Sequence, residues 1–130
     1  MHDLQARKPM KALLLIAHGS RKASSNQEVA DLAAKLKQKD HGFDLIEHAF
    51  LELTDPKVPH TIDSLVNSGA SHITLMPYFL AAGMHVTEDL PELLDDAKTQ
   101  YPNVSFKLLT HLGAAQQMPE WILGFAQDKA

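Results

Sequence analysis

Residues 11–17 read KALLLIA, and the chain continues over 18–21 as HGSR. The first seven residues form a continuous apolar run that is too short for a core helix and is closely followed by a glycine. This pattern is typical of a strand that is covered on both faces of its sheet. We therefore predict that residues 11–17 form a buried strand of a parallel sheet and that the polar residues after it lie at the edge of that sheet.

Helical and strand patterns alternate along the rest of the chain. Apolar residues recur with a helical period between 26 and 39, which predicts an amphipathic helix. The elements predicted after it are a strand over 43–51, a helix over 59–68, a strand over 72–80 whose regular pairing stops at Pro77, a helix capped by Asp89, a strand over 105–109 and a helix over 119–127. This order predicts an α/β fold with a mostly parallel sheet and helices on both of its faces.

Composition limits the kinds of function. We interpret the 130 residues as a single α/β domain over 1–130 with a loose N-terminus over 1–10. The net charge of −4 and the lack of a long basic run argue against a nucleic-acid partner. No apolar run approaches the ~20 residues that span a bilayer, and the first ten residues lack the core of a signal peptide, so we expect a cytoplasmic protein without a membrane partner. Cysteine is absent, which leaves His, Asp and Glu as metal ligands.

Three titratable residues follow the ends of predicted strands. His18 and His85 lie in loops that contain glycine, and ligands of open α/β sheets bind beyond the carboxyl ends of the strands. Neutral imidazole binds late first-row divalent ions and accepts a proton near neutral pH, although imidazoles that only fix a loop are also common. Glu52 is a candidate third ligand or proton acceptor, with a solvated loop glutamate as the alternative. Solvated or hydrogen-bonded side chains are the simpler interpretation of His2, His41, His48, His60 and His72.

The residues after His18 suit an anion. Ser20 offers a hydroxyl and Arg21 a guanidinium beside the start of a predicted helix, where unpaired N–H groups attract carboxylate or phosphate. The alternative is that these residues only begin a helix, with Ser24, Ser25 or Asn26 as its N-cap. That alternative explains the serines but not Arg21.

Three motifs resemble those of the short-form CbiX-type class II chelatases, which insert a divalent metal ion into sirohydrochlorin. HGSR follows the first predicted strand, FLEL..P begins at 50, and P.FL..G.HV..D.P begins at 77, within a likeness that runs from about 11 to about 113. The resemblance implies that His18 and His85 handle the metal and accept protons, and that Glu52 lies in or near the same cleft. It also implies a homodimer that resembles the two halves of longer chelatases.

The resemblance further implies how the substrates are held. Sirohydrochlorin carries many carboxylates, so we expect Ser20, Arg21 and the helix start to bind its rim. Apolar surface for the ring is expected from Phe50, Phe79, Leu80 and Met84. No tightly bound cofactor is expected, because the divalent ion is a substrate. Cobalt, iron and nickel all accept imidazole, so neither the metal nor the pathway, cobalamin or sirohaem, follows from the sequence.

Two other functions compete with metal insertion. A non-catalytic carrier of a metal or a tetrapyrrole would use the same residues. Histidine phosphatases also place HG at a strand end, but their R-H-G pattern needs an arginine where this chain has Ala17, so the charge-assisted phosphate contact is missing. The chain departs from the chelatases in having no histidine-rich tail and in the loose match of residues 110–119, THLGAAQQMP, and we assign no role to His111.

Overall fold

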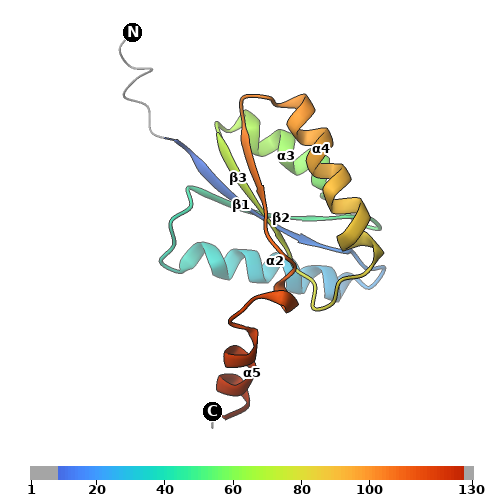
Figure 1. The fold of residues 1–130 in the computed structure, drawn as a ribbon, viewed down its shortest axis with the longest axis vertical. Coiled ribbons are helices and arrows are strands. Elements are labelled where there is room, and N and C mark those ends of the chain that lie inside the picture. Colours follow the sequence, from blue (N-terminus) through green and yellow to red (C-terminus); the bar gives the residue numbers. More distant parts are fainter. Residues whose placement is uncertain (1–8, 128–130) are drawn as a thin grey trace.

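One parallel sheet organises the molecule. The computed structural model describes residues 9–127, and of His85 it describes the backbone only. The sheet has the strand order β2-β1-β3-β4 (Figure 1). Its strands are β1 (Lys11–Ala17), β2 (Leu45–Phe50), β3 (His72–Pro77) and β4 (Ser105–Leu108). All three pairings are parallel, as the alternating pattern of the sequence predicts.

Helices cover both faces of this sheet. One face packs against α2 (Ala23–Gln38), and the other packs against α3 (Val58–Asn67) and α4 (Leu90–Gln100) (Figure 1). The predicted α/β arrangement is therefore confirmed. Three further elements complete the described chain: the π-helix η1 (His85–Asp89), the short 3-10 helix η2 (Leu112–Ala114) and α5 (Met118–Gln127).

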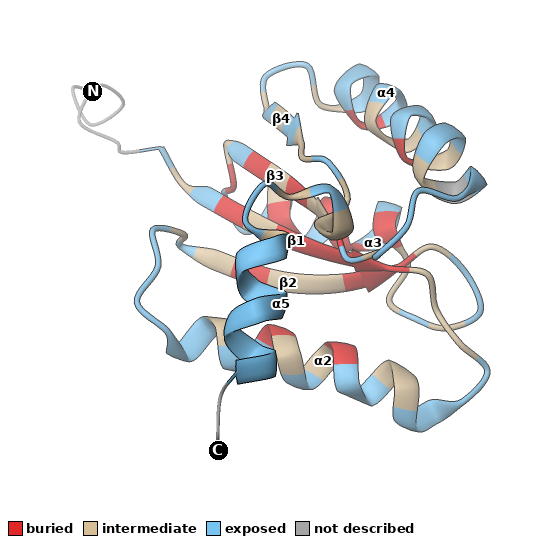
Figure 2. Ribbon diagram, turned by 60° about the horizontal axis from the view of Figure 1, so that its bottom comes forward, coloured by how far each residue is buried: buried red, intermediate tan, exposed pale blue. Residues whose placement is uncertain are grey.

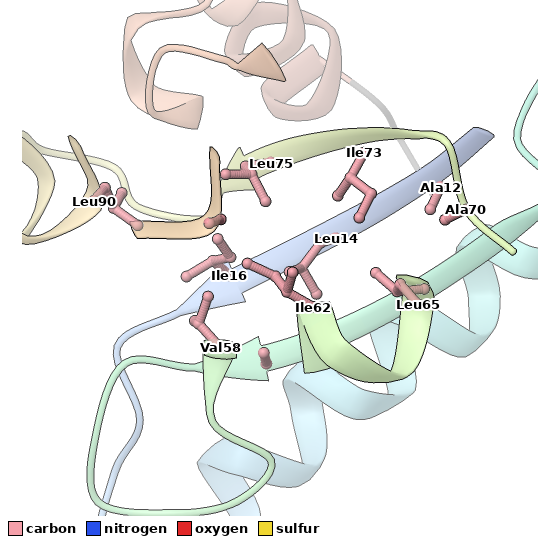
Figure 3. Close-up of a cluster of buried hydrophobic side chains, with 12 residues drawn as sticks. Ala12, Leu14, Ile16, Val58, Ile62, Leu65, Ala70, Ile73, Leu75 and Leu90 are labelled. Carbon is pink, nitrogen blue, oxygen red and sulfur yellow. The ribbon is translucent and has the colours of Figure 1, made fainter. Parts of the chain in front are cut away.

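The apolar run of β1 is continuous because β1 lies between β2 and β3 in the sheet and because helices cover both faces of the sheet there. Leu14 and Ile16 pack into the larger core with side chains of β3, α3 and α4 (Figure 3). Leu15 and Ala17 point to the other face, where they join a smaller core with α2 that includes Val29. Burying each of the large aliphatic side chains stabilises the fold by about 1.5–3 kcal/mol.

Element boundaries differ most from prediction at helix starts. α2 begins at Ala23 rather than Asn26, its N-cap is Lys22, and no side chain caps it. Asp89 does not act as a side-chain cap of α4, because it has helical dihedral angles and continues η1 directly into that helix. The sequence did not predict η1. Pro77 ends β3 as expected, and the remaining elements lie at or near their predicted ranges.

The last helix lies apart from the sheet. α5 extends away from the other elements, and none of its residues is buried (Figures 1 and 2). The large apolar side chains exposed on it are Trp121, Ile122, Leu123 and Phe125. None of the helices within residues 9–127 has the length and apolar character needed to cross a bilayer.

Candidate functional site

Parallel pairing brings the loops after β1 and β2 together at the carboxyl edge of the sheet. The ladder continues beyond the strands themselves, because the Leu51 N–H donates to the Ala17 carbonyl at 2.9 Å and the Glu52 N–H donates to the His18 carbonyl at 3.1 Å. The residue after β1 and the second residue after β2 are therefore neighbours. The loop after β3 begins at the same edge on the other side of β1 (Figure 1).

The side chains of His18 and Glu52 are in contact at this edge. His18 Nε2 lies 2.8 Å from Glu52 Oε2, and the two side chains are 40% and 50% exposed. The sequence predicted that both residues follow strand ends, and the structure places them in direct contact. Imidazole and carboxylate are both ligands for divalent ions and both accept protons. The pair can therefore present a base and a ligand to a molecule that arrives from solvent.

Gly19 makes the close approach of the two loops possible. Its φ of +99° is favourable for glycine but strained for other residues. A Cβ atom at this position would lie 1.9 Å from the carbonyl oxygen of Glu52, which is main chain and cannot turn aside. The glycine after His18 is therefore required by backbone contact as well as by dihedral angle.

His85 follows β3 in the chain and is the first residue of η1. The turn before η1 is held by Gly83, whose carbonyl accepts hydrogen bonds from the N–H groups of Val86 and Thr87. The Thr87 hydroxyl also donates to the Gly83 carbonyl at 3.2 Å and to the Met84 carbonyl at 3.3 Å. Short π-helical segments occur frequently at functional sites. Among the described side chains, which exclude that of His85, there is no group of three or more His, Asp or Glu suited to hold a metal.

Ser20 is bound into its loop by side-chain hydrogen bonds. Its hydroxyl oxygen accepts a bond from the Lys22 N–H at 3.0 Å. Its backbone N–H donates to Oδ1 of Asn26 at 2.9 Å, and its carbonyl accepts from Nδ2 of Asn26 at 2.7 Å. Arg21 is exposed beside the start of α2. From the sequence, Asn26 was a candidate helix cap, and its bond to the loop was not predicted. Its place in the first turn after HGSR is the signal that could have suggested that bond.

The four apolar candidates differ in exposure. Leu80 and Met84 are 76% and 70% exposed in the loop after β3. Phe79 is partly buried and packs against the larger core. Phe50 is only 2% exposed and belongs to the core beneath α2, where its ring meets that of His48 edge-on at 5.5 Å. Phe50 therefore has no surface with which to contact a substrate ring, unlike the expectation from the sequence, because its side chain points to the α2 face.

An apolar cavity of about 280 Å³ lies next to η1. Residues from the end of β3, from η1, from the start of α4 and from the segment after β4 line it, among them Pro77, Val86, Leu90, Leu109 and His111. Binding sites for drug-sized ligands usually enclose about 300–1,000 Å³, so this cavity suits an edge of a large ring rather than a whole macrocycle.

Two groups with shifted pKa values lie away from the carboxyl edge. Burial lowers the pKa of His48 on β2 below its usual value of 6.5, with a smaller opposing effect from the charge of Glu47. A hydrogen bond to the carboxylate of Asp63 raises the pKa of Tyr101 above its usual value. Neither group contributes a base or ligand to the loops after β1 and β2.

Comparison with known proteins gives a consistent family. The CbiX family model matches residues 12–128. The chain is 39% identical over 85 residues to the sirohydrochlorin cobaltochelatase of Methanococcus aeolicus, a match that covers 65% of this chain and 59% of that protein. It is 30% identical over 101 residues to the chloroplastic sirohydrochlorin ferrochelatase of Arabidopsis thaliana, over 78% of this chain and 44% of that protein. The matched part therefore spans less than two thirds of the length of these relatives.

Solved structures share the fold. The sirohydrochlorin chelatase SirB from Bacillus subtilis subspecies spizizenii, in complex with cobalt, superposes with a TM-score of 0.79 at 27% identity. That match covers 93% of this chain and 51% of SirB. A protein from Marinobacter aquaeolei VT8, described as a putative cobalamin biosynthesis CbiX protein, gives a TM-score of 0.76 over 90% of this chain and 94% of that one; at 23% identity this match supports the fold alone.

Proposed function

Because this chain belongs to the CbiX family, we propose that it inserts a divalent metal ion into sirohydrochlorin. The observation that carries the proposal is the contact of 2.8 Å between the His18 imidazole and the Glu52 carboxylate at the exposed carboxyl edge of the sheet. Relatives named sirohydrochlorin cobaltochelatase and sirohydrochlorin ferrochelatase support the same reaction.

The chemistry requires weak ligands and proton acceptors in one place. Two pyrrole N–H protons leave the macrocycle while the ion loses water and enters the ring, and no group is oxidised or reduced. His18 and His85 act as metal ligands and proton acceptors, and Glu52 serves as a further ligand or base. A site with few ligands keeps the ion exchangeable, whereas a complete set of tight ligands would retain it.

The surroundings of the pair suit an acidic macrocycle. Arg21 and the start of α2 attract the carboxylates of the substrate rim, and the Ser20 hydroxyl remains able to donate because its oxygen acts as the acceptor toward Lys22. Leu80 and Met84 offer exposed apolar surface to the ring, and the partly buried Phe79 lies in the same loop. Cobalt, iron and nickel are the candidate ions; solved relatives of this chain are described with cobalt and with Fe³⁺.

We infer that two copies of the chain form a homodimer through α5. A helix of 10 residues is shorter than the ~12–15 residues at which isolated helices become even marginally stable in water, and α5 has no buried residue to stabilise it. Its side chains Met118, Trp121, Ile122 and Phe125 follow the helical spacing of an apolar stripe. Since SirB is about twice as long as its matched part, two copies of this chain would supply a comparable amount of protein around one macrocycle.

Metallation of sirohydrochlorin by the purified protein tests the reaction. Absorbance of the macrocycle is followed with Co²⁺, Fe²⁺ and Ni²⁺ in turn, with substrate in large excess over protein. We expect many turnovers per chain with at least one ion, and their loss in His18→Ala. The matched control is His41→Ala, because His41 is exposed near the amino end of β2, where its ring accepts from the Phe43 N–H at 3.1 Å.

The same experiment separates the enzyme from a carrier. A carrier would bind the metal or the macrocycle stoichiometrically without accelerating insertion over the reaction in buffer. Insertion rates that equal those in buffer with every ion would contradict the proposed function. Equal rates in His18→Ala and His41→Ala would contradict the role of His18.

A further inference from the structure

Asn26 ties the loop after β1 to the first turn of α2. Its Oδ1 accepts from the Ser20 N–H at 2.9 Å, and its Nδ2 donates to the Ser20 carbonyl at 2.7 Å. A carboxamide carries a donor and an acceptor in one plane, as a peptide group does, so it pairs with Ser20 much as a neighbouring strand would. One side chain therefore satisfies both hydrogen-bonding directions of the Ser20 backbone.

The other side of this loop is held by the loop after β2. The Glu52 N–H donates to the His18 carbonyl at 3.1 Å, and Gly19 lies directly against the Glu52 carbonyl. Residues 18–20 are thus bound between the β2 loop on one side and Asn26 on the other. The backbone conformation at His18, and with it the direction in which the imidazole points, depends on both sets of contacts.

We propose that Asn26 is a positioning residue for the pair formed by His18 and Glu52, acting through the backbone of Ser20. The inference rests on the proposed metal insertion, because that reaction makes the direction of the imidazole matter. Both polar atoms of the Asn26 carboxamide bond to the Ser20 backbone, so Asn26 acts through the loop rather than by touching the ion. Reactions between aligned groups lose about 10²-fold in rate when a group is misplaced by about 1 Å.

Single-turnover insertion of Co²⁺ into sirohydrochlorin gives the first test. Asn26→Ala removes both bonds to Ser20, and Asn26→Asp keeps the acceptor but turns a second oxygen toward the Ser20 carbonyl. Gln27→Ala is the matched control, because Gln27 is the next residue of α2 and its side chain bonds instead to Asp31 at 2.9 Å. We expect the rate to fall about 10- to 100-fold in Asn26→Ala, to fall less in Asn26→Asp, and to stay within about twofold in Gln27→Ala. A folded Asn26→Ala protein with the rate of Gln27→Ala would overturn the inference.

Magnetic resonance of the His18 ring nitrogens gives a second test that does not depend on insertion. Glu52→Ala removes the partner of the imidazole and defines the ring spectrum of the broken pair. Asn26→Ala, or Asn26→Asp if the alanine variant does not fold, is expected to move the His18 signals toward that spectrum, whereas Gln27→Ala leaves them unchanged. Unchanged His18 signals in a folded Asn26 variant overturn the positioning role. Shifted signals in a protein whose wild type inserts no metal support the positioning role and reject the proposed function.

Discussion

The backbone of Glu52 is bonded to the backbone of His18, and their side chains are in contact as well. The N–H to carbonyl distance is 3.1 Å, and the distance between Nε2 and Oε2 is 2.8 Å. The parallel pairing of β1 with β2 therefore extends into the site and determines which side chains meet there. A substitution that separates the two loop backbones should separate the imidazole from the carboxylate.

Gly19→Ala tests this relationship. The added Cβ would lie 1.9 Å from the Glu52 carbonyl oxygen, at a φ of +99° that alanine adopts only with strain. We expect a loss of about 1–3 kcal/mol in the free energy of unfolding and slower metal insertion, measured by urea denaturation and by single-turnover absorbance. Gly42→Ala is the control, since a Cβ at Gly42 has nothing within 4 Å. Equal stability and activity in the two variants would show that the backbone contact is not needed.

His85→Ala should abolish metal insertion while the protein stays folded, because His85 lies in the loop after β3 and begins η1 rather than a strand of the core. General acid–base catalysis contributes about 10²- to 10⁴-fold in rate, and the loss should fall in or above that range. His72→Ala is a suitable control, as His72 is an exposed histidine at the first position of β3. Insertion at the wild-type rate by well-folded His85→Ala protein would remove His85 from the site.

Phe125→Asp should convert a homodimer into monomers. Phe125 is 86% exposed in the single chain, so a charge there costs the monomer little but opposes burial against a second copy. Light scattering at micromolar concentration measures the change in mass. Glu120→Lys changes the charge on the opposite side of α5, by the helical period, and should leave the dimer intact. A wild-type protein that is active as a monomer would contradict the inferred homodimer.

Stability at acid pH should depend on His48. Burial lowers its pKa in the folded protein below the value of 6.5 that an unfolded chain would have, so the unfolded state takes up a proton first as pH falls. The stabilising contribution is therefore present above the unfolded value and is lost as pH decreases toward the folded value. We expect His48→Gln to lose less stability than the wild type between about pH 7 and about pH 5 in urea denaturation. His60→Gln, at an exposed position of α3, should follow the wild type; identical curves for all three proteins would contradict the role of burial at His48.

The sequence predicted the features that depend on period and chain order. A continuous apolar run predicts a strand covered on both faces, and β1 is the strand that lies between β2 and β3 under helices of both layers. Because parallel strands end at one edge, the order of the elements predicted that His18 and Glu52 lie at the same edge of the sheet. Their direct contact follows from the pairing of β1 with β2, which the order of the elements does not determine.

Features that depend on side-chain direction or on tertiary contact could not be predicted. The run over 43–51 does not reveal which of its residues points toward α2, so Phe50 was taken as surface although it is buried. Asn26 is a residue type that often caps a helix. Only the folded structure shows that its side chain hydrogen-bonds to the backbone of Ser20 instead. The π-helix η1 has no sequence period of its own that separates it from the first turn of α4.

The exposed position of α5 links folding to assembly. A helix with no buried residue of its own gains its stability from whatever covers it, so in the proposed homodimer the second copy would stabilise α5. Helix content should then rise with protein concentration, in the same range in which the mass doubles. The segment 118–127 would then act as a sensor of protein concentration, because α5 would form only when enough copies are present to pair.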